Sequence, residues 1–171
     1  MAISMYQASV PVLVRALENL RHVLQKGEAF AADRGFEPGI LLQTRLVPDM
    51  LPLVRQVQIA ADMSARCAAR LAGDEPRSFA DEETTFAQLY ARLDAAIEYV
   101  ESFGAGRIDG SEGREIVVPQ RGGGERRFDG QSYLLQFTLP NVFFHVTTAY
   151  DILRQAGVPL GKADYIGGSR S

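Results

Sequence analysis

A line of polar side chains crosses the most apolar segment of the chain. Asn141, His145 and Thr148 follow one another at steps of four and three residues, among mostly apolar neighbours. In a helix, this spacing places the three side chains on one face. A buried imidazole needs hydrogen-bond partners, because an unpaired buried polar group costs about 1–3 kcal/mol. The pattern predicts a polar pocket around His145, which is either a core histidine satisfied by its neighbours or a group that binds a ligand or transfers a proton.

Burial also predicts the protonation state of His145. We expect the ring to lie inside the protein without a charged partner, and burial of this kind disfavours the protonated form. The pKa of His145 should therefore fall below its reference value of about 6.5. A carboxylate beside the ring, such as that of Asp49, would raise the pKa instead.

The chain offers few other side chains for catalysis or metal binding. Cys67 lies between two arginines, which lower the pKa of a thiol, but it also continues an apolar series at intervals of seven residues, so packing is its predicted role. His22 falls off the apolar stripe of its segment and is predicted to face solvent. Two histidines and one cysteine do not make a strong zinc site by themselves, because such a site needs three or four ligands. A metal bound here would need carboxylate or amide oxygens as well.

Length and charge narrow the classes of function. The chain has 171 residues, 46% of them hydrophobic, and a formal net charge of −3. These values are typical of a globular protein, so residues 1–171 are interpreted as a single domain. An acidic balance is not typical of a nucleic-acid-binding protein. No segment has the length of a membrane-spanning helix or the pattern of a signal peptide, and a lone cysteine suits a reducing compartment, so we expect a cytoplasmic protein.

Three segments in the first two thirds of the chain have the periodicity of amphipathic helices. The first helix is predicted to begin near Ser9, so that Pro11 lies in its first turn. The second carries a seam of apolar and small residues at alternating steps of four and three. The third is predicted to start at a cap provided by Ser78 or Asp81 and to end at Gly104. The seam of the second helix consists of Met50, Val54, Val57, Ala61, Ser64, Ala68 and Leu71.

A fourth helix and the segment before it complete the fold. Residues 104–131 are rich in glycine, and the runs 115–118 and 125–128 are predicted to form a β-hairpin. The fourth helix spans about 130–156, and Pro140 is predicted either to bend it or to separate a short first piece from it. Because its second half is apolar almost all round, it is predicted to be buried on every side. The predicted fold class is all-α: a four-helix bundle with a short β-hairpin inserted between helices 3 and 4.

Two stretches of the chain resemble a known family. Residues 139–167 (LPNVFFHVTTAYDILRQAGVPLGKADYIG) are similar to the signature of a bacterial protein family. Residues 45–53 (RLVPDMLPL) together with 71–76 (LAGDEP) resemble the other marked region of that family. The family is placed with the DinB/YfiT-like helical bundles, a superfamily described as metal-dependent enzymes, whose bundles have one or more long connections. The resemblance covers nearly the whole chain and implies a DinB/YfiT-like bundle.

The resemblance also implies where a metal would bind. In the superfamily, the ion is held by three histidines, one on the second helix and two in a His-x-x-x-His motif on the last. His145 matches the second histidine of that motif, Asn141 stands in the place of the first, and Gln58 lies near the position of the second-helix histidine. Amides are poor ligands for zinc or nickel. The chain is therefore expected to lack the full three-histidine metal site.

Two hypotheses for the function follow. In the first, the protein binds a small molecule or a partner through a polar pocket made of His145, Asn141, Gln58, Asp49 and Thr148. In the second, it is a divalent-metal-dependent transferase or hydrolase, in which His145 with carboxylate and amide ligands holds a weakly bound ion that activates water. The ligand count favours the first. A homodimer is also expected, from the tendency of the superfamily and from apolar residues expected on outer faces, which are Phe30, Phe36, Ile40 and Leu41.

Overall fold

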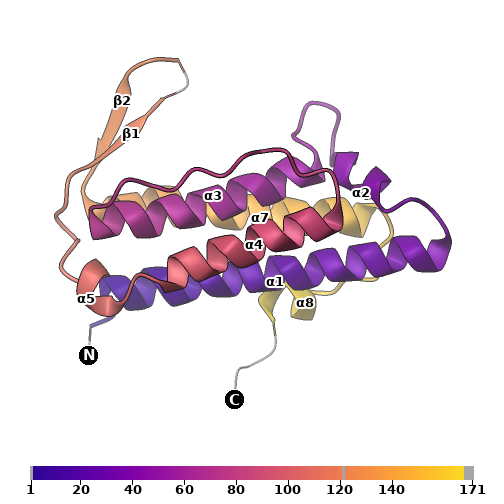
Figure 1. The fold of residues 1–171 in the computed structure, drawn as a ribbon, viewed down its shortest axis with the longest axis horizontal. Helices are drawn as coiled ribbons and strands as arrows, with labels where there is room; N and C mark the ends of the chain where they lie inside the picture. Colours follow the sequence, from indigo (N-terminus) through magenta and orange to yellow (C-terminus); the bar gives the residue numbers. More distant parts are fainter. Residues whose placement is uncertain (1, 121, 168–171) are drawn as a thin grey trace.

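The computed structural model, which describes residues 2–120 and 122–167, places four long helices side by side (Figure 1). The long helices are α1 (Met5–Arg34), α3 (Leu53–Ala72), α4 (Phe86–Glu101) and α7 (Leu139–Gln155). The short elements are α2 (Gly39–Gln43), α5 (Ala105–Ile108), β1 (Ile116–Pro119), β2 (Glu125–Phe128), α6 (Gly130–Ser132), the π-helix η1 (Tyr133–Thr138) and α8 (Lys162–Ile166). The two strands pair antiparallel and form a hairpin between α4 and α7. The predicted four-helix bundle with an inserted hairpin is confirmed.

The long helices do not alternate in direction along the chain. α1 and α7 run one way through the bundle, whereas α3 and α4 run the other way and are parallel to each other (Figure 1). A parallel pair needs a connection that returns along the bundle, and α3, with its 20 residues, is about 30 Å long. Residues 73–85, called the strap below, make this connection along the outside of the bundle (Figure 1). This is a long connection of the kind that the resemblance implies.

α1 begins at Met5 rather than near Ser9. The hydroxyl of Ser4 accepts a hydrogen bond from the backbone N–H of Gln7, and the side-chain oxygen of Gln7 accepts one from the backbone N–H of Ser4. This reciprocal cap supplies partners for the first turn and starts the helix there. Pro11 therefore lies inside the helix, where its missing N–H removes one backbone hydrogen bond.

The seam predicted for the second helix lies in the core. All of its members within α3 are buried, and Ser64 satisfies its hydroxyl by donating to the carbonyl oxygen of Ala60 at 2.8 Å. Met50 is the exception, because Pro52 precedes the first residue of α3 and Met50 lies outside the helix, half-buried. Cys67 is fully buried, and burial raises the pKa of its thiol to about 12, which confirms packing as its role.

α4 starts later than predicted. Its cap is Thr85, which exchanges hydrogen bonds with Gln88, and neither Ser78 nor Asp81 caps a helix. Asp81 lies in the strap and pairs with Arg55 instead. The two predicted caps and Thr85 are all residue types that begin helices. The contacts of the strap with the rest of the bundle decide between them.

Pro140 separates a short first piece from the fourth helix, as predicted. α6 and η1 form this piece, and in η1 the backbone N–H of Leu139 donates to the carbonyl oxygen of Leu134, five residues back. The prediction that this helix is buried on every side was wrong, since Phe143 and Phe144 are 39% and 55% exposed. A helix of a four-helix bundle packs on its neighbours with its inner face and meets solvent with the outer one.

The surface differs in part from the one expected for a homodimer. Leu41 is buried in the core, so it offers nothing to a partner. Phe30 and Phe36 are half-buried and pack edge to face on each other, whereas Ile40 is exposed. Within the ranges that the structure describes, no helix combines the length and apolar character needed to cross a bilayer.

Candidate functional site

His145 lies in the middle of α7 and faces the first turns of α3. Its Nδ1 is 2.7 Å from the side-chain oxygen Oε1 of Gln56. Gln56 is buried, whereas His145 is half-buried. α3 and α7 lie side by side and run in opposite directions (Figure 1). The middle of α7 lies beside the beginning of α3. The imidazole therefore lies at the boundary of α3 and α7, between the core and solvent.

A second hydrogen bond fixes the tautomer of His145. Nε2 of Gln56 donates to the carbonyl oxygen of Leu51 at 2.9 Å, which leaves the amide oxygen facing the ring. Because an amide oxygen can only accept, Nδ1 of His145 carries a proton, and Nε2 of the neutral ring holds the lone pair. Among the described residues, Nε2 of the ring has no hydrogen-bond partner. The site therefore presents one acceptor atom.

The surroundings of His145 keep its ring neutral. Burial lowers the pKa of His145 below its ordinary value, in the direction expected from the sequence. The ring of Phe144 meets the imidazole edge to face, with the two centroids 5.2 Å apart. At neutral pH, the histidine is thus an acceptor with an apolar neighbour.

Asn141 and Thr148 do not hydrogen-bond to His145. Nδ2 of Asn141 donates to the carbonyl oxygen of Phe137 at 2.6 Å, and the hydroxyl of Thr148 donates to that of Phe144 at 2.8 Å. Both side chains therefore donate their hydrogen bonds to carbonyl oxygens on the preceding helical turn, as short polar side chains in helices often do. The predicted polar line contributes one available group, the imidazole.

Gln58 and Asp49 lie elsewhere. The amide of Gln58 donates to Glu83 at 2.7 Å and accepts from Arg55 at 2.6 Å. Positions 56 and 58 are about 200° apart around a helix, so when Gln56 faces α7, residue 58 faces away from it. Asp49 is exposed in the segment before α3. The glutamine that meets His145 is Gln56, two positions from the expected one.

Gln58 belongs to an ionic cluster around Arg92. The side chain of Arg92 is 1% exposed and donates to three carboxylates, those of Asp62 (2.6 Å), Asp81 (3.1 Å) and Glu83 (2.8 Å). It also donates to two backbone carbonyl oxygens, one in the strap and one in α3. A buried charge is tolerated only when it is paired and hydrogen-bonded in this way. The cluster holds the strap on α3 and α4.

The residues present do not fit the three-histidine metal centre that the resemblance implies. At the three matching positions, only His145 offers a nitrogen lone pair, because Asn141 and Gln58 are amides engaged in other hydrogen bonds. Over residues 2–120 and 122–167, no three His, Cys, Asp or Glu side chains come together as a ligand set. One imidazole falls short of the three or four protein ligands of a zinc site.

Comparison with known proteins shows the family. The family described as "Domain of unknown function (DUF1993)" matches residues 5–166. The chain belongs to the DUF1993 family. Among solved structures, this DUF1993 chain is similar to a DinB family member protein from Shewanella denitrificans, with 34% identity and a TM-score of 0.88 over 97% of this chain and 93% of that one. A search of the curated proteins gave no significant match.

Gln56 is the site residue of this DUF1993 chain that sequence reasoning missed. A signal for it exists, because Gln56 lies three residues after Leu53 and four before Ala60, on the buried series that also contains Cys67. A polar side chain on a buried stripe must find a partner. His145, which needed a partner as well, is the group that it finds.

Proposed function

We propose that this protein binds a small organic molecule at the boundary of α3 and α7, where Nε2 of His145 accepts a hydrogen bond from the ligand. The observation that carries the proposal is the orientation of the Gln56 amide, which is held by Leu51 and keeps the proton on Nδ1. An imidazole held in one tautomer is prepared for one kind of partner at its second nitrogen, an O–H or N–H group.

The neighbours of His145 suggest the rest of the ligand. Phe144 packs on the imidazole and Leu51 supplies the carbonyl that orients Gln56, and both side chains are exposed. Small-molecule sites combine apolar side chains with a few well-placed polar groups. The ligand therefore combines a hydrogen-bond donor with an apolar body.

The competing hypothesis is a divalent-metal-dependent transferase or hydrolase. A histidine that donates from Nδ1 and presents Nε2 is also the usual arrangement of a metal ligand. The number of ligands argues against it, since in the described part of the chain His145 belongs to no group of three or more His, Cys, Asp or Glu side chains that could hold a metal ion. We therefore expect a divalent ion to bind weakly, and an organic molecule with an O–H or N–H donor to bind to His145 more tightly than the ion.

NMR on protein labelled with ¹⁵N-histidine tests the proposal directly. The ring nitrogens of His145 should report a neutral ring with its proton on Nδ1 at pH 7. Gln56→Leu removes the acceptor that holds this tautomer, so the two tautomers should then exchange. A fragment panel rich in phenols and amides should shift the His145 ring signals, and His145→Gln should abolish binding of the hits. His22→Gln is the matched control, because His22 is exposed on α1 and hydrogen-bonds to Asp164.

Two results would contradict the proposal. A proton on Nε2 in the parent protein would mean that the Gln56 amide does not orient the ring. A stoichiometric metal ion in protein purified without a metal column, lost in His145→Gln, would favour the metal-dependent hypothesis instead.

A further inference from the structure

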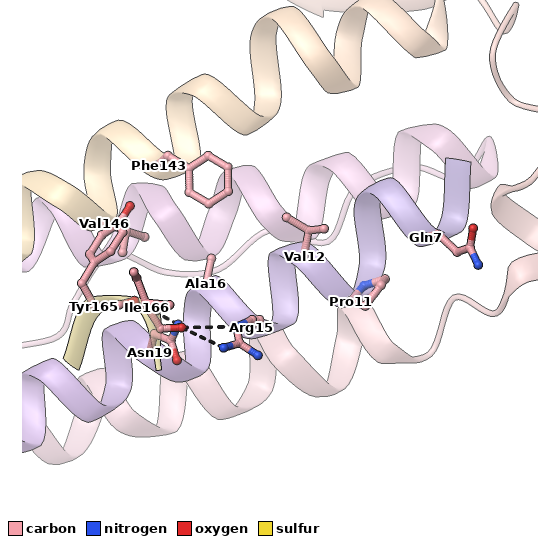
Figure 2. Close-up of a pocket in the computed structure, with 10 residues that line it drawn as sticks. All are labelled: Gln7, Pro11, Val12, Arg15, Ala16, Asn19, Phe143, Val146, Tyr165 and Ile166. Atoms are coloured by element: carbon pink, nitrogen blue, oxygen red, sulfur yellow. Dashed lines mark hydrogen bonds between the residues drawn. The ribbon is translucent and has the colours of Figure 1, made fainter. Parts of the chain in front are cut away.

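Three segments outside the long helices are each held by an arginine that donates to a backbone carbonyl oxygen. Arg15 of α1 donates to a carbonyl oxygen of α8 at 3.0 Å (Figure 2), and Arg92 of α4 donates to one of the strap at 2.8 Å. The third is Arg45, whose Nη1 donates to the carbonyl oxygen of Met50. Hydrogen bonds from a charged donor are about twice as strong as neutral ones. The segment that Arg45 holds continues to the site of His145.

Arg45 belongs to residues 44–53, called the α2–α3 loop below, whose two ends lie together. The backbone N–H of Leu53 donates to the carbonyl oxygen of Thr44 at 3.0 Å, which closes the loop. The side chain of Arg45 spans the loop from near its beginning to Met50 near its end. Compact surface loops with closed ends are packed by their own side chains and frequently serve function.

Two constraints fix the direction of the Leu51 carbonyl group. The hydrogen bond from Arg45 holds the peptide plane on one side of Leu51, because that plane contains the carbonyl oxygen of Met50. Pro52 restricts the other side, since a residue before proline is biased toward extended backbone. With both sides held, the Leu51 oxygen points toward Gln56, which donates to it at 2.9 Å.

The Leu51 oxygen decides which way round the Gln56 amide lies. A carbonyl oxygen can only accept, so it faces the NH₂ group of Gln56 and leaves the amide oxygen for the imidazole of His145 at 2.7 Å. If the Leu51 oxygen moves away, the amide can turn over and present its NH₂ group to Nδ1. Nδ1 then accepts, the proton lies on Nε2, and the site offers a donor in place of an acceptor.

We propose that Arg45 is a positioning residue for the His145 site: by holding the carbonyl oxygen of Met50, it keeps the Gln56 amide turned so that Nε2 of His145 accepts. This role rests on the proposed function, in which that acceptor binds the ligand. Arg45 acts on the ring through the α2–α3 loop and Gln56. The loop thereby sets whether the site selects a ligand that donates a hydrogen bond or one that accepts.

NMR on ¹⁵N-histidine-labelled variants of Arg45 at pH 7 tests the proposal. Arg45→Met keeps an aliphatic side chain but removes the donor, so the separation of the Nδ1 and Nε2 signals of His145 should shrink to a value between those of the parent and Gln56→Leu. Arg45→Lys keeps a charged donor and should restore part of the parent separation. Arg154→Met is the matched control, because Arg154 is exposed on the same helix as His145, and the separation should stay at the parent value. Thermal unfolding of each variant confirms that it is folded.

Binding of phenol, followed through the His145 ring signals, should weaken in the same order. The apparent dissociation constant rises as the population of the competent tautomer falls, so two equally populated tautomers give a loss of about twofold. Arg154→Met should bind phenol as the parent does.

The outcomes separate this role from the proposed function. A proton on Nε2 in the parent would overturn both. A proton on Nδ1 in the parent, with the same signal separation in Arg45→Met, would overturn the role of Arg45 alone. A lower melting temperature in Arg45→Met with an unchanged tautomer would make its hydrogen bond to Met50 a purely structural contact. Equal shrinkage in Arg45→Met and Arg154→Met would assign the effect to net charge instead of the loop.

Discussion

Replacing Arg92 with leucine tests the ionic cluster that holds the strap on the bundle. In the native protein, Arg92 compensates the carboxylates of Asp62, Asp81 and Glu83, two of which are largely buried. Leucine fills part of the space but carries no charge. Asp81 keeps a second cation, since it also pairs with Arg55 at 2.6 Å. Asp62 also keeps a second cation, Arg66 at 2.9 Å, whereas Glu83 loses the guanidinium that enters its buried surroundings.

The loss of stability in Arg92→Leu follows from the burial of Arg92 and its carboxylate partners. Removing one partner of a buried ion pair costs about 3–5 kcal/mol, because the other charge stays buried. Burial already raises the pKa of Asp62, so this carboxyl can take up a proton when the cation is removed, and the cost stays in the lower half of that range. For a chain of this size, about 1 kcal/mol lowers the melting temperature by about 2–4 °C. Arg92→Leu should therefore lower it by roughly 6–16 °C.

Thermal unfolding followed by circular dichroism measures this change, and limited trypsin digestion locates it. Arg77 lies in the strap, so release of the strap should speed cleavage at that residue. Arg107→Ala is the control, because Arg107 pairs with Asp74 at 2.8 Å with both side chains about half exposed. An exposed pair contributes about 0–1 kcal/mol, so the control should change little. Equal melting temperatures of the two variants, or unchanged cleavage at Arg77, would refute the reasoning.

Three other predictions concern the core, the acids of the cluster and the histidine. Val57→Asp should cost about 3–5 kcal/mol, because Val57 is fully buried and the new carboxylate lacks a partner; an unchanged melting temperature would contradict the core position of the seam. Asp62→Asn should destabilise the protein less than Glu83→Gln in urea titrations at pH 7. Burial raises the pKa of Asp62, whereas for Glu83 the effect of burial is outweighed by hydrogen bonds from an arginine and a glutamine, which lower its pKa. The folded-state pKa of His145 lies below the unfolded value of about 6.5, so on acidification the unfolded state takes up the proton first. The free energy of unfolding that is present above about pH 6.5 therefore decreases as the pH is lowered through that value. His145→Gln should reduce that fall in urea titrations between about pH 7.5 and 5, and equal slopes would count against a buried neutral ring.

Local patterns were enough to predict the four long helices and the hairpin. The seam of α3 repeats at helical spacing, so its burial could be predicted without knowing its partner helices. Pro140 lacks an N–H, so a break before α7 was predictable as well. The hairpin also formed where two short runs flank a glycine-rich turn. Each of these features depends on neighbours within a few positions along the chain.

The candidate site depended on features that act over longer distances. Which of Gln56 and Gln58 faces His145 depends on the rotation of α3 about its axis, and a rotation of that helix is set by all of its packing contacts together. The start of α4 depends on the strap, whose acids bind Arg92 instead of capping a helix. The periodicity of α7 marks its residues as apolar but does not say which face meets solvent. Hydrogen bonds and ion pairs between residues dozens of positions apart leave no periodic trace in the chain, and only the packed bundle brings their two ends together.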